Sequence, residues 1–576
     1  MHIPAPGLRL PAPMSSVPYI PSAPLSPTTN AAGAVSLPSN FLLGAASAAA
    51  QVEGAAHLDG RTDSIWDAFC RRPGAIKDTT SPETACDHYH RYADDVALMK
   101  AMNLDSYRFS TSWTRVMPDA RTVNPAGLDF YSRLVDSLLE AGILPWLTLY
   151  HWDLPQVLEE AGGWPVRDTA YRFVEYAMAV HEALSDRVRC WTTINEPWCS
   201  AYLSYIAGEH APGRHNRAAG IAAGHHLLLA HGLAAEAIKA ADPEANVGLA
   251  LNLWPFDAAD LENPGDVAAA VKQDGTWNRA FMDPVLRGAY PEDVAGWYGE
   301  DLARVVLPGD LEIISTPIDS LGVNFYNGSV MKATAVVSTV APFGVPAKYS
   351  KRSEETLWGE DDGAGSTTLA SEADSDSSPT PSVEPDSEAV RVETTGITTP
   401  APSTDYTLAD DGLPDGLRNG THWVQGPNPA PEGVDYGDSG LPVTDMGWAI
   451  QPEGLTRLLR RLQEDYTGPR GIALWITENG AAYTDEVGPN NYVNDQNRLD
   501  YIDKHLRAVQ DALDSGVDIR GYQVWCLMDN FEWALGYTTR FGVVHCDFET
   551  QQRTPKASGM WYAEVARTKT IPPRSA

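Results

Sequence analysis

Cysteine is scarce in this chain, with six residues among 576, and none of them forms a C-x-x-C pair. This density is too low for the disulfide framework of a small secreted domain, and free thiols in a reducing compartment fit it better. We therefore expect a cytoplasmic protein. The cysteines are Cys70, Cys86, Cys190, Cys199, Cys526 and Cys546.

Long apolar runs and basic residues are also lacking. No stretch of about 18 consecutive apolar residues occurs, so no membrane-spanning helix is predicted. The opening MHIPAPGLRLPAP has neither the basic start nor the unbroken apolar stretch of a signal peptide. Lys and Arg number 42 against 76 Asp and Glu, which gives a net charge of −34. Phosphate backbones and anionic lipids repel such a chain, so nucleic-acid and membrane partners are not expected.

Several catalytic signatures are missing from the sequence. The chain has no G-x-S-x-G, no G-x-G-x-x-G and no P-loop pattern. Serine-hydrolase and nucleotide-binding functions therefore have no support.

Two segments differ from the rest of the chain in composition. Residues 1–38 are rich in Pro and Ala, and we expect a disordered tail there. Residues from about 345 to 440 are polar and low in complexity; Lys351–Gly416 alone holds 16 acidic and 3 basic residues. Such a segment buries too little apolar surface to offset the entropy of ordering, so we expect a disordered acidic insertion. The remainder of 39–570 is expected to form one domain.

Short apolar strands alternate with amphipathic segments along that domain. Helices are expected at Leu128–Glu140, Tyr171–Leu184 and Gly454–Tyr466, where apolar residues recur at helical spacing. Alternation of this kind favours a parallel sheet covered by helices, and eight units close into a (β/α)8 TIM barrel, an α/β fold. The insertion then falls between strands six and seven. The expected strands are 41–48, 105–111, 144–150, 189–197, 247–252, 320–327, 471–480 and 521–530.

Polar residues stand at the carboxyl ends of these strands, where barrels of this type place their active sites. Glu196 ends the fourth strand and Glu478 ends the seventh, each beside an asparagine. A pair of carboxylates suits cleavage of a glycosidic bond, because one can protonate the leaving oxygen while the other attacks or stabilises the anomeric carbon. A separation of about 5–5.5 Å gives retention and about 6.5–9.5 Å gives inversion. The sequence alone leaves these two outcomes open.

Six motifs in order resemble those of the β-glucosidase family known as glycoside hydrolase family 1. They are GAASAAAQVEGA, YRFSTSWTRVMP, TLYHWDLPQ, TINEP, ITENG and DNFEWALGYTTRFG. The likeness covers about residues 38–335 and 441–570. It implies a retaining β-glucosidase that removes terminal β-D-glucosyl units from small glycosides and cello-oligosaccharides by double displacement.

The resemblance assigns roles to individual residues. It implies that Glu196 is the general acid/base and Glu478 the nucleophile, with Arg108, Tyr326 and Asn324 supporting the nucleophile. Repulsion from a charged Glu478 would keep Glu196 protonated near neutral pH.

The resemblance also implies a sugar pocket, in which Glu532 would bind the 4- and 6-hydroxyls and Trp525 would form a platform under the ring. A carboxylate at position 532 would repel a phosphate, so unphosphorylated substrates are expected. The residues implied in substrate binding are Gln51, His151, Trp152, Asn195, Trp525, Glu532 and Trp533.

Neither a cofactor nor a metal is expected. The stretch CDHYHRY, with Cys86, His88 and His90, resembles a metal cluster, but in this family it opens a helix without metal. His225, His226 and His231 lie on a predicted helix and point partly in different directions.

Two alternatives to the β-glucosidase prediction remain. One is a β-galactosidase or β-fucosidase of the same family, and the other is a non-catalytic sugar-binding barrel. A small-molecule β-glycoside is the only partner expected, and no oligomeric state is predicted.

Overall fold

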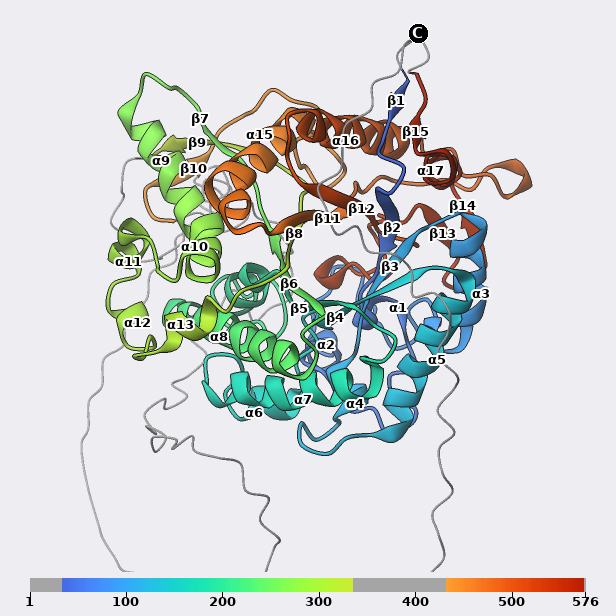
Figure 1. Ribbon diagram of the computed structural model, residues 1–576, viewed down its shortest axis with the longest axis horizontal. Coiled ribbons are helices and arrows are strands. Elements are labelled where there is room, and N and C mark those ends of the chain that lie inside the picture. Colours follow the sequence, from blue (N-terminus) through green and yellow to red (C-terminus); the bar gives the residue numbers. More distant parts are fainter. Residues whose placement is uncertain (1–33, 335–430, 574–576) are drawn as a thin grey trace, which may run out of the picture. The chain divides into compact units, whose positions relative to one another are not determined.

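A computed structural model of the protein describes residues 34–334 and 431–573. Eight parallel strands close into a barrel in the order β11-β12-β2-β3-β4-β5-β6-β8. Figure 1 shows these strands gathered at the centre with helices around them. The predicted (β/α)8 barrel is therefore confirmed. Its strands are β2 (Leu42–Ala46), β3 (Ser106–Ser110), β4 (Leu144–Tyr150), β5 (Cys190–Asn195), β6 (Asn246–Asn252), β8 (Ser320–Asn324), β11 (Ala473–Asn479) and β12 (Ile519–Trp525).

The barrel strands are buried on both faces, as expected for a sheet lined inside by side chains and covered outside by helices. Every residue of β3, β4, β5, β8 and β11 is buried. The apolar composition of these segments follows from that burial.

Large aromatic residues fill the amino-terminal end of the barrel. Trp146 and Trp475 meet there with ring centroids 4.6 Å apart, in a cluster with the first residues of three strands. Those first residues are Leu144, Cys190 and Ala473. Because this end is packed, the polar strand ends at the opposite rim are left to form a site.

Helix α5 (Pro125–Ala141) begins and ends at recognisable capping residues. In α5 the side chain of Asn124 accepts from the amide of Ala126, Pro125 is the first helical residue, and Gly142 ends the helix with φ of 79°. The main helices are α3 (His88–Ala101), α5 (Pro125–Ala141), α7 (Asp168–Leu184), α8 (Arg217–Ala241), α9 (Pro264–Asp274), α10 (Ala280–Arg287), α15 (Pro452–Leu462), α16 (Gln496–Asp514) and α17 (Ala557–Thr568).

The three helices predicted from sequence are confirmed as α5, α7 and α15, with ends shifted by a few residues. The largest shift is in α15, which stops at Leu462 and continues as a wider π-turn over Gln463–Thr467.

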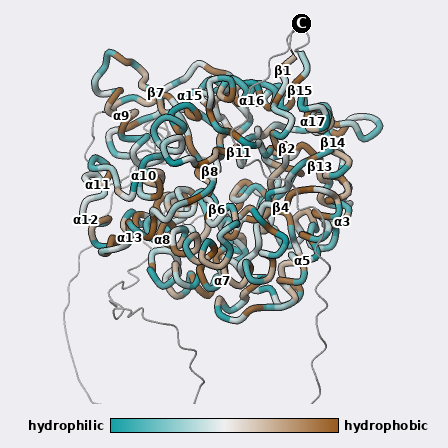
Figure 2. The backbone as a smooth tube through the Cα atoms, viewed as in Figure 1, coloured by the Kyte–Doolittle hydropathy of each residue, from teal (hydrophilic) through white to brown (hydrophobic). Residues whose placement is uncertain are grey.

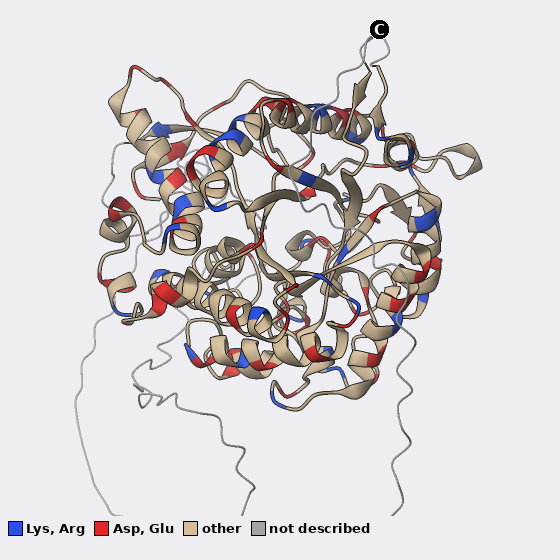
Figure 3. Cartoon of the chain, viewed as in Figure 1, with Lys and Arg blue, Asp and Glu red and all other residues tan. Residues whose placement is uncertain are grey.

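The chain around β8 and α8 is largely hydrophobic in Figure 2. Charged residues gather on the outer helices and loops in Figure 3. No helix in the described ranges is long and apolar enough to cross a membrane.

Within residues 34–334 and 431–573, three small sheets lie outside the barrel. Strand β9 (Ser329–Ala333) pairs with both β7 (Phe256–Ala258) and β10 (Val434–Tyr436). Strand β13 (Val544–Cys546) pairs with β14 (Arg553–Pro555), and β1 (Val35–Ser36) pairs with β15 (Thr570–Ile571).

Two of these strands fall inside the segments predicted to be disordered. The backbone of β1 is paired and Leu37 is buried, so the ordered chain begins before residue 39. Strand β10 likewise begins before residue 441. The remainder of the predicted tail and of the acidic insertion lies outside the described residues.

Candidate active site

The two glutamates stand at the carboxyl ends of their strands, and both are buried. Glu478 is the sixth residue of β11, and Glu196 follows directly after β5. Glu196 has φ of 47°, a left-handed conformation that an ordinary residue seldom adopts. This conformation ends the strand at Asn195 and turns the glutamate out of the ladder. Positive φ at a non-glycine residue is concentrated at functional sites.

Glu478 is held by two donors, one on each oxygen. A terminal guanidinium nitrogen of Arg108 donates to Oε1 at 2.6 Å, and the hydroxyl of Tyr326 donates to Oε2 at 2.7 Å. Burial raises the pKa of Glu478, while Arg108 and Tyr326 oppose that rise. A carboxylate with a fixed guanidinium and a phenol on its two oxygens is favoured in the charged form.

Glu196 has a different surrounding, without a guanidinium of its own. The amide of Asn324 donates to Oε1 at 2.6 Å, and the thiol of Cys199 donates to Oε2 at 3.0 Å. Burial, and then the charge of Glu478, raise the pKa of Glu196 to about 8. At neutral pH this carboxyl therefore keeps its proton while Glu478 is the better stabilised anion.

Two asparagines join the surroundings of the two carboxyls. The second terminal nitrogen of Arg108 donates to Oδ1 of Asn195 at 2.6 Å, and Asn324 donates to the same oxygen at 3.0 Å. Asn324 accepts in turn from the hydroxyl of Thr477 at 2.6 Å, and its amide also opposes the rise in the pKa of Glu478. Asn324, predicted from the resemblance to support the nucleophile, thus makes its 2.6 Å hydrogen bond to Glu196.

The predicted sugar-binding side chains converge beside this pair. Gln51, from α1 (Ala49–Val52), donates to the backbone oxygen of Phe531 at 2.8 Å and to Oε2 of Glu532 at 3.4 Å. Burial, together with the charge of Glu478, raises the pKa of Glu532 to about 8. The His151 ring stacks near Trp525 and Trp533, with centroid distances of 5.6 and 5.9 Å.

Trp152 contacts two other predicted sugar-binding residues, Asn195 and Trp533. Its indole N–H donates to the backbone oxygen of Asn195 at 3.0 Å, and its ring lies 4.6 Å from that of Trp533. These contacts fix both residues.

Some buried polar atoms of the predicted site residues have no protein partner. Gln51 Oε1, His151 Nδ1 and Arg108 Nε find no hydrogen bond in the described part of the chain. Buried polar groups are normally satisfied, so atoms of this kind indicate a polar ligand or ordered water. The amide of Asn195 donates to Nε2 of His151 at 3.1 Å, which leaves the proton of the neutral ring on Nδ1. Burial and Arg108 keep the pKa of His151 low, so the ring is neutral.

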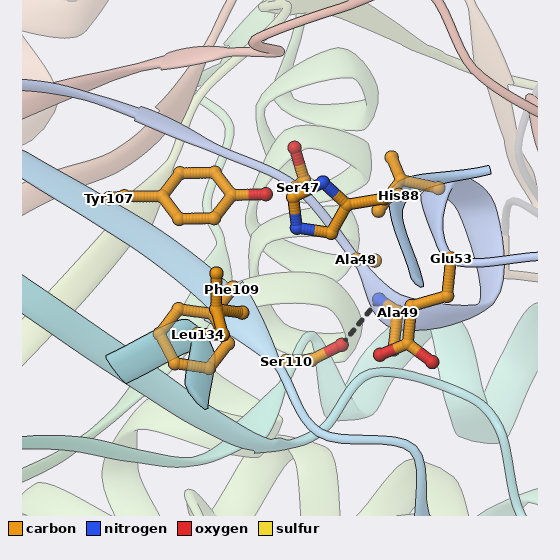
Figure 4. Close-up of a pocket in the computed structure, with 10 residues that line it drawn as sticks. Ser47, Ala48, Ala49, Glu53, His88, Tyr107, Phe109, Ser110 and Leu134 are labelled. Atoms are coloured by element: carbon orange, nitrogen blue, oxygen red, sulfur yellow. Dashed lines mark hydrogen bonds between the residues drawn. The ribbon is translucent and has the colours of Figure 1, made fainter. Parts of the chain in front are cut away.

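A small cavity lies beside the first two barrel strands and is lined by none of the predicted site residues (Figure 4). Tyr107 and His88 face it, and the Tyr107 hydroxyl and His88 Nε2 have no partner among the described residues. Its volume of about 10 Å³ matches a single water molecule. On the same wall the amide of Ala49 donates to Oγ of Ser110 at 2.8 Å, which fixes the start of the helical turn that carries Gln51.

The histidine groups considered as metal ligands have separate partners. His88 contacts Asp95 at 2.7 Å and His90 contacts Asp87 at 2.6 Å. His225 contacts Asp310 at 2.9 Å, and His231 contacts Thr193 at 2.6 Å. Among the described residues no three His, Cys, Asp or Glu side chains are placed to share a metal ion.

Cys199, Thr477 and Asn252 were missed by the sequence analysis, although each contacts the site or a residue in it. Asn252 ends the fifth strand, so the strand-end pattern that marked Glu196 and Glu478 could have found it. Thr477 stands beside Glu478 in ITENG, so the same strand-end pattern covers it, whereas Cys199 carries no such signal.

The model of glycosyl hydrolase family 1 matches residues 34–368 and 405–571. The thermostable β-glucosidase B of Thermobispora bispora is 41% identical, over 94% of this chain and 92% of that protein. A bifunctional β-D-glucosidase/β-D-fucosidase of Bifidobacterium breve is 38% identical, over 91% and 97% of the two chains. The crystal structure of the psychrophilic β-glucosidase BglU from Micrococcus antarcticus is similar with a TM-score of 0.75 and 46% identity, over 93% and 98% of the two chains.

Proposed function

The chain belongs to glycosyl hydrolase family 1 and is a retaining β-glucosidase, and we propose that Glu478 is its nucleophile and Glu196 its acid/base. The observation that carries the assignment is the unequal support of the two carboxyls. Glu478 has Arg108 on one oxygen and Tyr326 on the other, whereas Glu196 has an amide and a thiol.

In the first step the carboxylate of Glu478 attacks the anomeric carbon. The bond from that carbon to the glycosidic oxygen breaks, and the proton of Glu196 passes to the leaving oxygen. Arg108 and Tyr326 hold the attacking carboxylate in place, so the reaction needs little reorganisation. The product is a glycosyl ester on Glu478 and a free aglycone.

In the second step Glu196 acts as a base. Esterification removes the charge of Glu478, which is one of the two causes that raise the pKa of Glu196. The pKa of Glu196 then falls, and its carboxylate takes a proton from water while the water oxygen attacks the anomeric carbon. The ester bond breaks and β-glucose leaves with Glu196 protonated again.

We propose that glucose is the unit removed, which the β-glucosidase relatives favour. Gln51, His151 and Glu532 present hydrogen-bonding atoms, and Trp525 and Trp533 present aromatic faces. We propose that the hydroxyls of a terminal glucosyl unit satisfy the buried atoms Gln51 Oε1 and His151 Nδ1. Activity on fucosides is a second candidate, which the bifunctional relative favours. Comparing kcat/KM for nitrophenyl glucoside, galactoside and fucoside distinguishes these substrates.

We further propose a cytoplasmic location, which the free state of all six cysteines supports. Titration of the thiols in protein isolated without a reducing agent tests this, with six free thiols expected and fewer than six counting against it.

The role of Glu478 as nucleophile is tested by trapping the covalent intermediate. A 2-deoxy-2-fluoroglucoside with a good leaving group slows the second step, so the glycosyl ester accumulates and can be located by peptide mass spectrometry. The label is expected on Glu478. Glu478→Gln serves as the control, and it should take up no label. A label on any other residue would contradict the assignment.

A further inference from the structure

Cys199 lies three residues after the acid/base glutamate. It begins η1 (Cys199–Leu203), a π-helical turn that follows β5. Its side chain is buried, and its sulfur lies 3.0 Å from Oε2 of Glu196. Because Asn324 occupies Oε1, each oxygen of this carboxyl has a donor of its own. Single π-turns of this kind are common at functional sites.

Asn252 sets the direction of the thiol hydrogen. Its amide nitrogen donates to the sulfur of Cys199 over 3.5 Å. The backbone oxygen of Asn252 accepts in turn from the indole of Trp277 at 2.8 Å, which fixes the end of β6. With its sulfur accepting on one side, Cys199 is left to donate its hydrogen on the other, to Glu196.

We propose that Cys199 is a positioning residue that holds Glu196 in place and favours its ionised form, through the relay Asn252 to Cys199 to Glu196. This inference rests on the proposed role of Glu196 as acid/base. It assigns the thiol a part in the reaction without contact to the substrate.

The protonation states of the two groups agree with this arrangement. Burial and the charge of Glu196 raise the pKa of the Cys199 thiol well above its ordinary value, so it keeps its hydrogen and remains a donor. Four side chains besides burial act on Glu196. The charge of Glu478 raises its pKa, while Asn324, Cys199 and Arg108 lower it.

The Cys199 thiol lowers the pKa of Glu196 in both steps of the reaction. A donor to the ionised carboxyl lowers the pKa of Glu196 in the free enzyme, and it also stabilises the base that the second step needs. Without it, Glu196 would hold its proton to higher pH in the first step. In the glycosyl ester it would lose that proton only at higher pH, so the second step would slow in acid.

A purely structural role of Cys199 predicts a different result for the pH profile. Buried cysteine often serves as a small apolar residue that fills space. Removing such a residue would lower the stability of the fold and leave the pH dependence of the reaction unchanged. The pH profile therefore separates positioning from packing.

The experiment compares Cys199→Ala and Cys199→Ser with the same two changes at Cys190. Cys190 is a buried thiol at the start of β5, the strand that precedes Cys199, at the packed end of the barrel, and burial alone raises its pKa. The quantities measured are the pH profile of kcat/KM on an aryl glucoside, the pH profile of kcat on a dinitrophenyl glucoside, and Tm. Cys199→Ala is expected to shift the alkaline limb of the kcat/KM profile and the acid limb of the kcat profile to higher pH, each by about half a pH unit. Cys199→Ser keeps a donor and should bring both limbs back to the wild-type position or below it.

Equal shifts in the two Cys199 variants, or profiles no different from those of the Cys190 variants, would overturn the proposal. If Cys199→Ala lowers Tm too far to assay, the comparison of Cys199→Ser with wild type still tests the proposal. A hydroxyl is a stronger donor than a thiol, so neither limb should move to higher pH in that variant. Glu196→Ala separates this failure from failure of the proposed function. If Glu196 is the acid/base, that variant loses the alkaline limb whatever the Cys199 variants do.

Discussion

Arg108 and Glu478 form an ion pair of 2.6 Å in which neither side chain is more than 4% exposed. The guanidinium reaches Asn195 with its second terminal nitrogen, so a single planar group holds Glu478 and Asn195 together. A fork of donors in fixed geometry is a property of arginine that lysine lacks.

Arg108→Lys should therefore lower kcat/KM by about 10²-fold or more, even though the positive charge is kept. Steady-state kinetics on nitrophenyl glucoside give the measurement. Arg304→Lys is the matched control, because Arg304 is an exposed partner of Glu300. A loss of less than about threefold in Arg108→Lys would show that the fork is not needed.

Removing either glutamate should lower the rate of hydrolysis. The anomer of the glucosyl azide that forms when azide is added should differ between the two variants. Glu478→Ala is expected to lose activity on the order of 10⁵-fold. Added azide should restore turnover and give the α-glucosyl azide, because azide enters directly on the face that Glu478 vacates.

Glu196→Ala should instead form the glycosyl ester from a dinitrophenyl glucoside and give the β-glucosyl azide. The product anomers are read by NMR. Glu262→Ala, at an exposed position, should behave as wild type. If Glu478→Ala gave the β-azide and Glu196→Ala the α-azide, the roles of nucleophile and acid/base would have to be exchanged between the two glutamates.

The raised pKa of Glu196 also predicts a cost in stability that grows with pH. Its folded-state pKa is about 8 against an ordinary value of 4.5, so the folded state binds this proton more tightly than the unfolded state does. The stability due to this group is complete below about pH 4.5 and is lost as the pH rises toward 8. Glu196→Gln has no proton to lose and should escape this loss.

We expect Tm of Glu196→Gln to match wild type near pH 4.5 and to exceed it by about 1–3 °C near pH 8. Thermal unfolding followed across this range is the measurement. Glu564→Gln, at an exposed ion pair, should show no widening gap in this range. A constant difference at all pH values would mean that the folded state does not hold the Glu196 proton.

Glu532 should exclude phosphorylated sugars. Burial and the charge of Glu478 raise its pKa to about 8, so Glu532 repels a phosphate by its own charge only toward alkaline pH, while Glu478 supplies the negative charge near this site at neutral pH. We expect kcat/KM for nitrophenyl glucoside 6-phosphate to be at least about 10³-fold below that for the unphosphorylated glucoside. Glu532→Ser should narrow this gap, whereas Glu160→Ser, at an exposed position, should not. An unchanged ratio in Glu532→Ser would assign the exclusion to another residue.

The barrel could be predicted from sequence because its strands are continuous apolar runs separated by helices of ordinary length. The predicted ends of the strands were less accurate than their existence and order. The strand expected at 189–197 stops at Asn195, since Glu196 takes a left-handed conformation, and the one expected at 320–327 stops at Asn324. The sheet of β7, β9 and β10 was missed. Its strands are short and only partly buried, so they carry no strong alternation.

The candidate site could be predicted where residues stand at strand ends or match a family motif. The hydrogen bonds of Asn324 and Cys199 to Glu196 could not, because they depend on which strands become neighbours and on the turn after β5. The unequal surroundings of the two glutamates likewise appear only in three dimensions.

The central claim is that Glu478 and Glu196 act by double displacement at one anomeric carbon. The most direct test is the anomer of the first glucose released, observed by proton NMR before mutarotation. The account predicts β-glucose first, with α-glucose appearing only as the two anomers equilibrate. Release of α-glucose first would contradict it.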